Sequence, residues 1–180
     1  GAPFEYNGQL YFVWSGWPGD VGDFPQNTYI ASMSDPLTLS SPRVLISEPD
    51  QPWERSVAAI NEGQEPFVHG DSLSIVYSAD ASWTSAYKLG VLHLTGDDPL
   101  DPEAWTKIGP VFEQNGTTYG PGHNSMPVTS PDGSEYWLIY HAKTVPSDGW
   151  GDRAIFAQEF TWNEDGTPNF GTLIPRETAQ

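Results

Sequence analysis

The sequence predicts an all-β fold in which three similar antiparallel sheets follow one another along the chain. A turn glycine followed by a strand of alternating aromatic and β-branched residues occurs three times, as NGQLYFVWSG, HGDSLSIVYSAD and DGSEYWLIYHA. The glycines stand at positions 8, 70 and 133, so successive ones are 62 and 63 residues apart, and this regular spacing is the mark of a structural repeat. Helical periodicity is nearly absent, and 18 glycines with 17 prolines supply the turns.

Each repeat continues in the same way after its first hairpin. An apolar strand, a turn rich in Asp, Pro or Gly and a short closing strand follow in TYIASMSDPLTLSSPRVLI, YKLGVLHLTGDDPLDPEAWTKIGPVF and AIFAQEFTWNEDGTPNFGTLI. Each period therefore predicts about four strands, the pattern of a β-propeller blade. We place the three blades roughly at residues 1–57, 58–118 and 119–180. A three-sheet prism, or a sandwich whose repeats are accidental, is the alternative.

Three blades do not make a closed propeller, which usually has about four to eight, so the domain is expected to be partial. With 37% hydrophobic and 13% aromatic residues, the 180-residue chain is long and apolar enough for one folded domain. The net charge of −17 repels phosphate backbones and anionic lipid, so we expect neither nucleic acid nor a membrane surface as a partner. The sequence Asn115-Gly116-Thr117 is a glycosylation-type triplet and hints at secretion.

Two carboxylates lie just ahead of the alternating strand of the second repeat, in the segment AINEGQEPFVHG. These are Glu62 and Glu65, on either side of Gly63 and Gln64. In a propeller the first strand of each blade starts near the central axis, so residues at its start can converge on one pocket. The third repeat begins TYGPGHNSM, which puts His123 near the same axial place.

These segments resemble glycoside hydrolase family 43, most closely its exo-acting α-L-arabinofuranosidases. The resemblance rests on NEG before an alternating strand, on YGPGHNSM before YWLIYHA, and on GWGDR followed by FTWNEDGTPNFG, and it runs over essentially all 180 residues. It implies a five-bladed β-propeller that cleaves arabinose- or xylose-containing plant polysaccharides with inversion. Three carboxylates do the chemistry in that family: an Asp as general base, a second Asp that orients the acid, and a Glu-Gly glutamate as general acid.

Glu62 is the residue that matches the general acid of the resembling family. A glutamate in that role must hold its proton near neutral pH, which calls for burial or a nearby negative charge. Glu65 is the alternative, because the family usually has a proline after Glu-Gly where this chain has Gln64. The position that matches the second Asp falls immediately before Gly1. We therefore expect the other two carboxylates and two blades from a second polypeptide, the N-terminal chain of a common precursor that specific cleavage divides into a heterodimer.

Four residues are predicted to line the sugar pocket beside the acid. Trp14 and Trp83 occupy matching places in two repeats and offer aromatic faces to a sugar ring, and Arg153 in GWGDR can donate a fork of hydrogen bonds to hydroxyls. A salt bridge from Arg153 to Asp152 or to another carboxylate is the alternative. The resemblance implies that His123 lies on the axis beside a cation such as calcium, held through water, whereas no cofactor is expected to be required. His141 lies inside a strand and is expected to pack.

The resemblance thus implies a secreted, inverting glycoside hydrolase that releases arabinofuranose from plant cell-wall arabinan or arabinoxylan. A β-xylosidase or an endo-arabinanase of the same family is one alternative. A propeller that binds sugar without cleaving it, or one that serves protein contacts, would not need Glu62.

Overall fold

The computed structural model describes residues 1–20, 22 and 24–175, and their regular structure is almost entirely β-strand. The helical segments of this described part are two single 3₁₀ turns, Pro52–Glu54 and Pro102–Ala104. None of its helices is long and apolar enough to cross a bilayer. The prediction of an all-β chain is confirmed.

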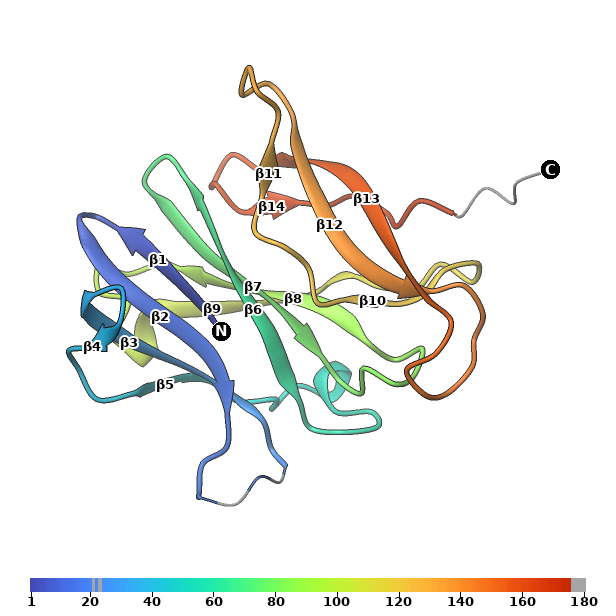
Figure 1. Ribbon diagram of the computed structural model, residues 1–180, viewed down its shortest axis with the longest axis horizontal. Helices are drawn as coiled ribbons and strands as arrows, with labels where there is room; N and C mark the ends of the chain where they lie inside the picture. Colours follow the sequence, from blue (N-terminus) through green and yellow to red (C-terminus); the bar gives the residue numbers. More distant parts are fainter. Residues whose placement is uncertain (21, 23, 176–180) are drawn as a thin grey trace.

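The strands form three antiparallel sheets that lie one after another in the sequence (Figure 1). The first sheet consists of β1 (Ala2–Tyr6), β2 (Gln9–Gly16), β3 (Asn27–Asp35), β4 (Thr38–Leu39) and β5 (Val44–Ser47). The second consists of β6 (Asn61–His69), β7 (Ser72–Ala79), β8 (Lys88–Leu94) and β9 (Trp105–Phe112). The third consists of β10 (Tyr119–Gly122), β11 (Val128–Thr129), β12 (Tyr136–Lys143), β13 (Arg153–Trp162) and β14 (Pro168–Asn169).

The glycines that mark the repeat occupy equivalent turns. Gly8, Gly70 and Gly133 have φ angles of 76°, 58° and 74°, a backbone conformation that costs glycine little and other residues more. The first two close the tight hairpins between β1 and β2 and between β6 and β7. The period seen in the sequence is therefore a repeat of turn geometry.

The second sheet is packed on both faces. Strand β7 has alternating side chains, and Leu73, Ile75 and Tyr77 join a core shared with the first sheet, whereas Val76 joins a core shared with the third. Figure 1 shows this green sheet between the blue first sheet and the orange and red third sheet. Burial on both sides explains why β7 reads as a nearly continuous apolar run.

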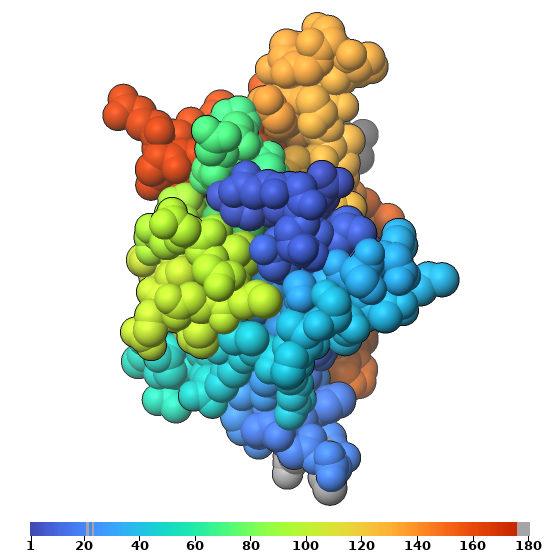
Figure 2. All heavy atoms as spheres, turned by 90° about the vertical axis from the view of Figure 1, so that its left-hand side faces the viewer, coloured from blue at the N-terminus to red at the C-terminus, as the bar shows by residue number. Residues whose placement is uncertain are grey.

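The first and third sheets each leave large apolar side chains uncovered. Leu39 in the first sheet is 49% exposed, and Ile155 in the third is 83% exposed. Figure 2 looks onto the first sheet, where the blue and cyan strands lie at the surface beside the yellow-green segment near residue 100. Such uncovered sheet faces are typical of surfaces that another element covers in an assembled protein.

Because β1 and β2, β6 and β7, and β10 and β12 are antiparallel pairs, the loop after the second strand of each pair lies at the end where the first strand starts. Among the described residues, these loops include 17–20, 22, 24–26, 80–87 and 144–152. They bring segments far apart in the sequence to the start of β6, where Glu62 lies.

Candidate functional site

A bulge in β6 sets the direction of both candidate acids. Glu62 pairs with Ser78 and Glu65 pairs with Val76, so β6 holds one more residue than β7 between these pairs. Gly63 makes the bulge possible with a φ of 62°. Because Ser78 and Val76 share a face of the sheet, the extra residue puts Glu62 and Glu65 on the same face.

The backbone just before Glu62 is held by a buried anchor. The side-chain amide of Asn61 donates to Oε1 of the fully buried Glu54 at 2.9 Å. The backbone N–H of Asn61 donates to the carbonyl of Gln26 at 2.9 Å, and its carbonyl accepts from the hydroxyl of Ser15 at 2.9 Å. This residue therefore ties the start of β6 to the first sheet and fixes the position from which Glu62 projects.

The hydroxyl of Tyr87 contacts both Glu62 and His123. It donates to Oε1 of Glu62 at 2.9 Å and lies 3.4 Å from Nδ1 of His123. Burial, with the nearby Glu62 carboxylate as a further cause, raises the pKa of Tyr87 well above its usual value, so its hydroxyl keeps its proton. One neutral donor thus joins the acid of the second sheet to the histidine of the third.

Two glycines leave room for this arrangement. A Cβ atom on Gly122 would lie 2.2 Å from the ring of Tyr87, and a Cβ on Gly63 would lie 3.3 Å from the ring of His123. The close approach of the Tyr87 ring therefore requires glycine at position 122, and at position 63 glycine is favoured by the positive φ and by the nearby ring of His123. The two glycines belong to the segments YGPGHN and NEG that mark this site in the sequence.

His141 and Arg153 extend the cluster on the third sheet. The ring of His141 stacks on that of Tyr87 with centroids 5.7 Å apart, and Nη1 of Arg153 lies 3.4 Å from Nε2 of His141. Burial, together with the charge of Arg153, lowers the pKa of His141 to about 4, so this imidazole is neutral at neutral pH. Arg153 makes no ion pair with Asp152 among the described residues, where the salt bridges are those of Lys107.

A cleft with a volume of about 310 Å³ opens beside Glu62. Glu62 is the one carboxylate among its described lining residues, and three of the others are tryptophans. The lining residues are Trp17, Gly22, Phe24, Gln26, Ile60, Glu62, Ser82, Trp83 and Trp150. An acid beside aromatic faces suits a ligand with both hydroxyl groups and apolar C–H surfaces, such as a sugar.

The sequence-predicted pocket residues do not all reach this cleft. Trp83 lines it, whereas Trp14 packs on the first sheet between Phe12 and Tyr29, with ring centroids 5.4 and 6.1 Å away. Trp14 pairs with Tyr29 across the sheet and shares its face, so alternation along β2 fixes its direction. The loop residue Trp17, three positions on, takes the place in the cleft that was expected for Trp14.

His123 and Arg153 lie beside the cleft rather than in its wall. His123 meets Glu62 through the hydroxyl of Tyr87, and Arg153 reaches the same cluster through His141. Glu65 has a pKa that burial raises, but it does not line the cleft.

Several residues of the site were not predicted. Trp17 and Trp150 carried a signal that could have found them, because each of the three cleft tryptophans follows the second strand of its repeat, in VWSGW, SADASW and VPSDGW. Tyr87 carried no such signal, since it stands in a loop directly before β8 and belongs to no motif. His141 packs as expected, but its neighbours are Tyr87 and His123.

The described residues do not fit a metal ion held by this chain alone. They contain no group of three His, Asp or Glu side chains placed to hold one. The ring neighbours of His123 are a phenol and an imidazole, whereas calcium takes carboxylate and carbonyl oxygens.

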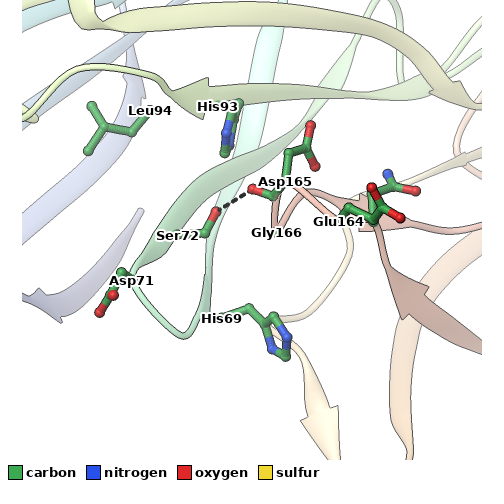
Figure 3. A pocket seen from close by; sticks show the side chains of 9 residues that line it. His69, Asp71, Ser72, His93, Leu94, Glu164, Asp165 and Gly166 are labelled. Carbon is green, nitrogen blue, oxygen red and sulfur yellow. Dashed lines mark hydrogen bonds between the residues drawn. The ribbon is translucent and has the colours of Figure 1, made fainter.

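A second cavity, of about 460 Å³, lies at the opposite end of β6 (Figure 3). His69, Asp71, His93 and Glu164 are among the residues that line it. Figure 3 shows Asp71 and Glu164 on different sides of the cavity, and its dashed bond joins the Ser72 hydroxyl to a backbone carbonyl. These titratable groups do not converge, so this cavity lacks the organisation found around Glu62.

The family model described as glycosyl hydrolases family 43 matches residues 1–168. Alpha-L-arabinofuranosidase B of Pyricularia oryzae is 36% identical over 185 residues, which cover 96% of this chain and 37% of that protein. The extracellular exo-alpha-(1->5)-L-arabinofuranosidase of Streptomyces avermitilis is 37% identical over 180 residues, covering 95% of this chain and 37% of that protein. The chain therefore spans just over a third of the length of these two relatives.

Two solved structures also match nearly all of this chain with only part of their own length. An alpha-L-arabinofuranosidase from Lactobacillus brevis superposes with a TM-score of 0.88 at 35% identity, and the match covers 99% of this chain and 57% of that one. A thermostable family-43 glycoside hydrolase superposes with a TM-score of 0.77 at 27% identity, covering 98% of this chain and 60% of that one. These fractions are those expected when three blades of five are present, and they confirm the partial propeller.

Proposed function

The chain belongs to glycosyl hydrolase family 43, and on this basis we propose that it supplies the general acid, Glu62, of an inverting α-L-arabinofuranosidase. The observation that carries the proposal is the position of Glu62, which lines a tryptophan-rich cleft and accepts a hydrogen bond from a buried tyrosine. The relatives named above are arabinofuranosidases, which favours arabinofuranosides as substrates.

The bond from Tyr87 assigns different roles to the two oxygens of Glu62. Because Oε1 accepts from the tyrosine, a neutral Glu62 carries its proton on Oε2. In the proposed reaction this proton passes to the glycosidic oxygen as its bond to the anomeric carbon breaks. A water molecule attacks that carbon from the opposite face, and a second carboxylate takes the proton of the water.

The second carboxylate must come from outside the described chain in this scheme. Inversion calls for two carboxyl groups about 6.5 to 9.5 Å apart, and Glu62 is the one carboxylate among the described residues of the cleft wall. We propose that a further segment supplies the base, the second Asp and two blades. The apolar side chains exposed on the first and third sheets support this, since blades on either side would cover them.

The segment that completes the ring is proposed to be a separate chain of the same precursor, which makes the protein a heterodimer. Two blades packed against both outer sheets would bury a large apolar interface and keep the two chains together. Native mass spectrometry of the protein from its source tests this. A second chain that stays bound to the 180-residue one supports it, whereas one continuous longer chain refutes the cleavage but not the propeller.

Secretion and a plant polysaccharide substrate belong to the same proposal. Two relatives are named extracellular arabinofuranosidases, and arabinan and arabinoxylan lie outside the cells that degrade them. The strongly acidic composition, with 24 Asp and Glu residues against 7 Lys and Arg, suits a neutral substrate better than a polyanionic one.

The decisive experiment compares Glu62→Gln with Glu65→Gln in the complete propeller, since the two residues share a face of β6. Loss of a general acid costs about 10² to 10⁴ in rate, so Glu62→Gln should lower kcat on arabino-oligosaccharides by that factor. It should lower kcat much less on an aryl arabinoside whose leaving group needs little protonation. A collapse in Glu65→Gln alone would move the acid to Glu65. Wild-type protein that binds arabino-oligosaccharides without cleaving them would support a sugar-binding propeller instead.

A further inference from the structure

The three tryptophans of the cleft come from equivalent loops of the three sheets. Trp17, Trp83 and Trp150 each lie in the loop that follows the second strand, at the end where Glu62 projects. Trp83 and Trp150 touch edge to face, with ring centroids 5.8 Å apart and an interplanar angle of 66°. Nε1 of Trp150 donates to the hydroxyl of Ser82 at 3.2 Å. The second and third sheets thus build one aromatic wall, which consists of Trp83 and Trp150.

A buried lysine joins the two loops that carry this wall. Lys143 is buried at the end of β12, and its ammonium donates to the backbone carbonyls of Trp83, Ser147 and Gly149. The carbonyl of Trp83 also accepts from the N–H of Gly149 at 2.7 Å. An ammonium has three donors, and here all three have a partner although none of the partners is a carboxylate.

Burying an ammonium without a carboxylate partner costs free energy. The presence of Lys143 at this buried position therefore needs an explanation. Its three acceptors belong to the loops around Trp83 and Trp150 and to no other part of the chain. The charge therefore holds the wall in one shape. A wall fixed in advance binds a ligand without the cost of ordering two mobile loops.

We propose that Trp83 and Trp150 form the subsite for the leaving-group sugar, and that Lys143 is the residue that positions them. The inference rests on the proposed function, because it is the general acid that defines the leaving group. Glu62 gives its proton to the oxygen of the leaving sugar, so that sugar lies against the part of the cleft that Glu62 faces. Glu62 and both tryptophans line that cleft.

The exposure of the wall agrees with this assignment. Trp150 is 61% exposed, and an indole so open to solvent offers a free face on which the C–H side of a furanose ring can stack. Tyr87, by contrast, is fully buried and stacks on His141, so its ring offers no free face to a sugar. The substrate class that fits is an arabino-oligosaccharide with at least one sugar beyond the cleaved bond.

The test is the ratio of kcat/KM for α-1,5-arabinotriose to kcat/KM for methyl α-L-arabinofuranoside, measured in the complete propeller. The methyl glycoside has no leaving-group sugar, so the ratio isolates the subsite. Trp150→Ala should lower the ratio about tenfold, which corresponds to about 1.4 kcal/mol of lost transition-state binding. Trp150→Phe should restore most of it. The matched control is Trp137→Ala, in β12 outside the cleft, which should leave the ratio unchanged.

Lys143→Met should lower the same ratio, because the wall loses the charge that holds it. Ser82→Ala, which removes the bond to Trp150 but keeps the lysine, should lower it by a smaller factor and gives a reading even where Lys143→Met fails to fold. An unchanged ratio in Trp150→Ala overturns the subsite. An unchanged ratio in a folded Lys143→Met overturns the positioning role.

Calorimetry separates a failure of this inference from a failure of the proposed function. If the wild-type protein cleaves neither arabinoside, the proposed function fails, but the subsite still predicts that arabinotriose binds more tightly than arabinose. Trp150→Ala should then remove that difference. Equal affinities of arabinotriose and arabinose for the wild-type protein overturn the subsite whatever the activity.

Discussion

The hydroxyl of Tyr87 and Oε1 of Glu62 are 2.9 Å apart, and the tyrosine is fully buried while the glutamate faces the cleft. In the proposed reaction, a buried neutral donor of this kind would stabilise the ionised carboxylate that remains once Glu62 has given up its proton, and would keep the other oxygen free for the substrate.

Tyr87→Phe should therefore lower kcat on arabino-oligosaccharides by about tenfold, because a hydrogen bond to a charged group contributes about 1.5 to 3 kcal/mol and part of this loss is recovered by water. A kcat equal to that of the wild type would show that Tyr87 only fills space.

The stability of the protein should depend on His141 in a defined pH window. Burial and the charge of Arg153 lower the pKa of this imidazole from 6.5 to about 4, so the unfolded chain takes up its proton before the folded chain does. The stabilisation is complete above pH 6.5 and is lost as the pH falls toward 4. Urea unfolding at pH 7 and pH 4.5 should show a smaller pH-dependent loss in His141→Gln. An equal loss in both proteins would mean that other groups cause it.

Gly122→Ala should destabilise the fold by overpacking. The added Cβ would lie 2.2 Å from the ring of Tyr87, which cannot withdraw because it stacks on His141. Overpacking a tight site costs about 1 to 3 kcal/mol in the free energy of unfolding. Gly151→Ala is the matched control, since a Cβ there has no atom within 4 Å. Similar unfolding midpoints for the two variants would contradict the close packing around Tyr87.

The buried Glu54 should contribute far more to the free energy of unfolding than the exposed Asp50, although both carboxylates bind Lys107. Nζ of Lys107 lies 2.8 Å from Oε2 of Glu54 and 2.6 Å from Oδ1 of Asp50. Glu54→Gln leaves the lysine without its buried partner and should cost about 3 to 5 kcal/mol. Asp50→Asn removes an exposed partner and should cost at most about 1 kcal/mol. Chemical denaturation of both variants compares them directly, and equal losses would show that burial does not set the strength of this pair.

The hairpin glycines made the three sheets predictable, because turn chemistry and strand alternation are local properties of the sequence. That Glu62 would lie beside a cleft was also predictable, from its place at the start of an inner strand, whereas its catalytic role stays a prediction. Trp14 illustrates the limit of such reasoning: it stands at the end of a strand, and only the sheet register shows that it faces Tyr29 and not the cleft.

Tyr87 and Lys143 could not be predicted as parts of the site. Their roles arise where loops of the second sheet meet strands of the third, and the sequence around each is an ordinary strand end. The bond from Tyr87 to Glu62 spans 25 positions, and that from Lys143 to the carbonyl of Trp83 spans 60. Contacts of this kind depend on how the sheets are packed, which local patterns do not encode.

The ammonium of Lys143 takes the structural role that a bound metal ion has in other proteins, since it joins two loops through their backbone carbonyls. Three backbone carbonyls surround its ammonium much as carbonyl oxygens surround a bound cation. Unlike an ion taken from solution, this charge is present in every copy of the protein and cannot be diluted, exchanged or chelated. We therefore expect the loops of Trp83 and Trp150 to keep their shape when EDTA or calcium is added, because the cation that joins them is part of the chain.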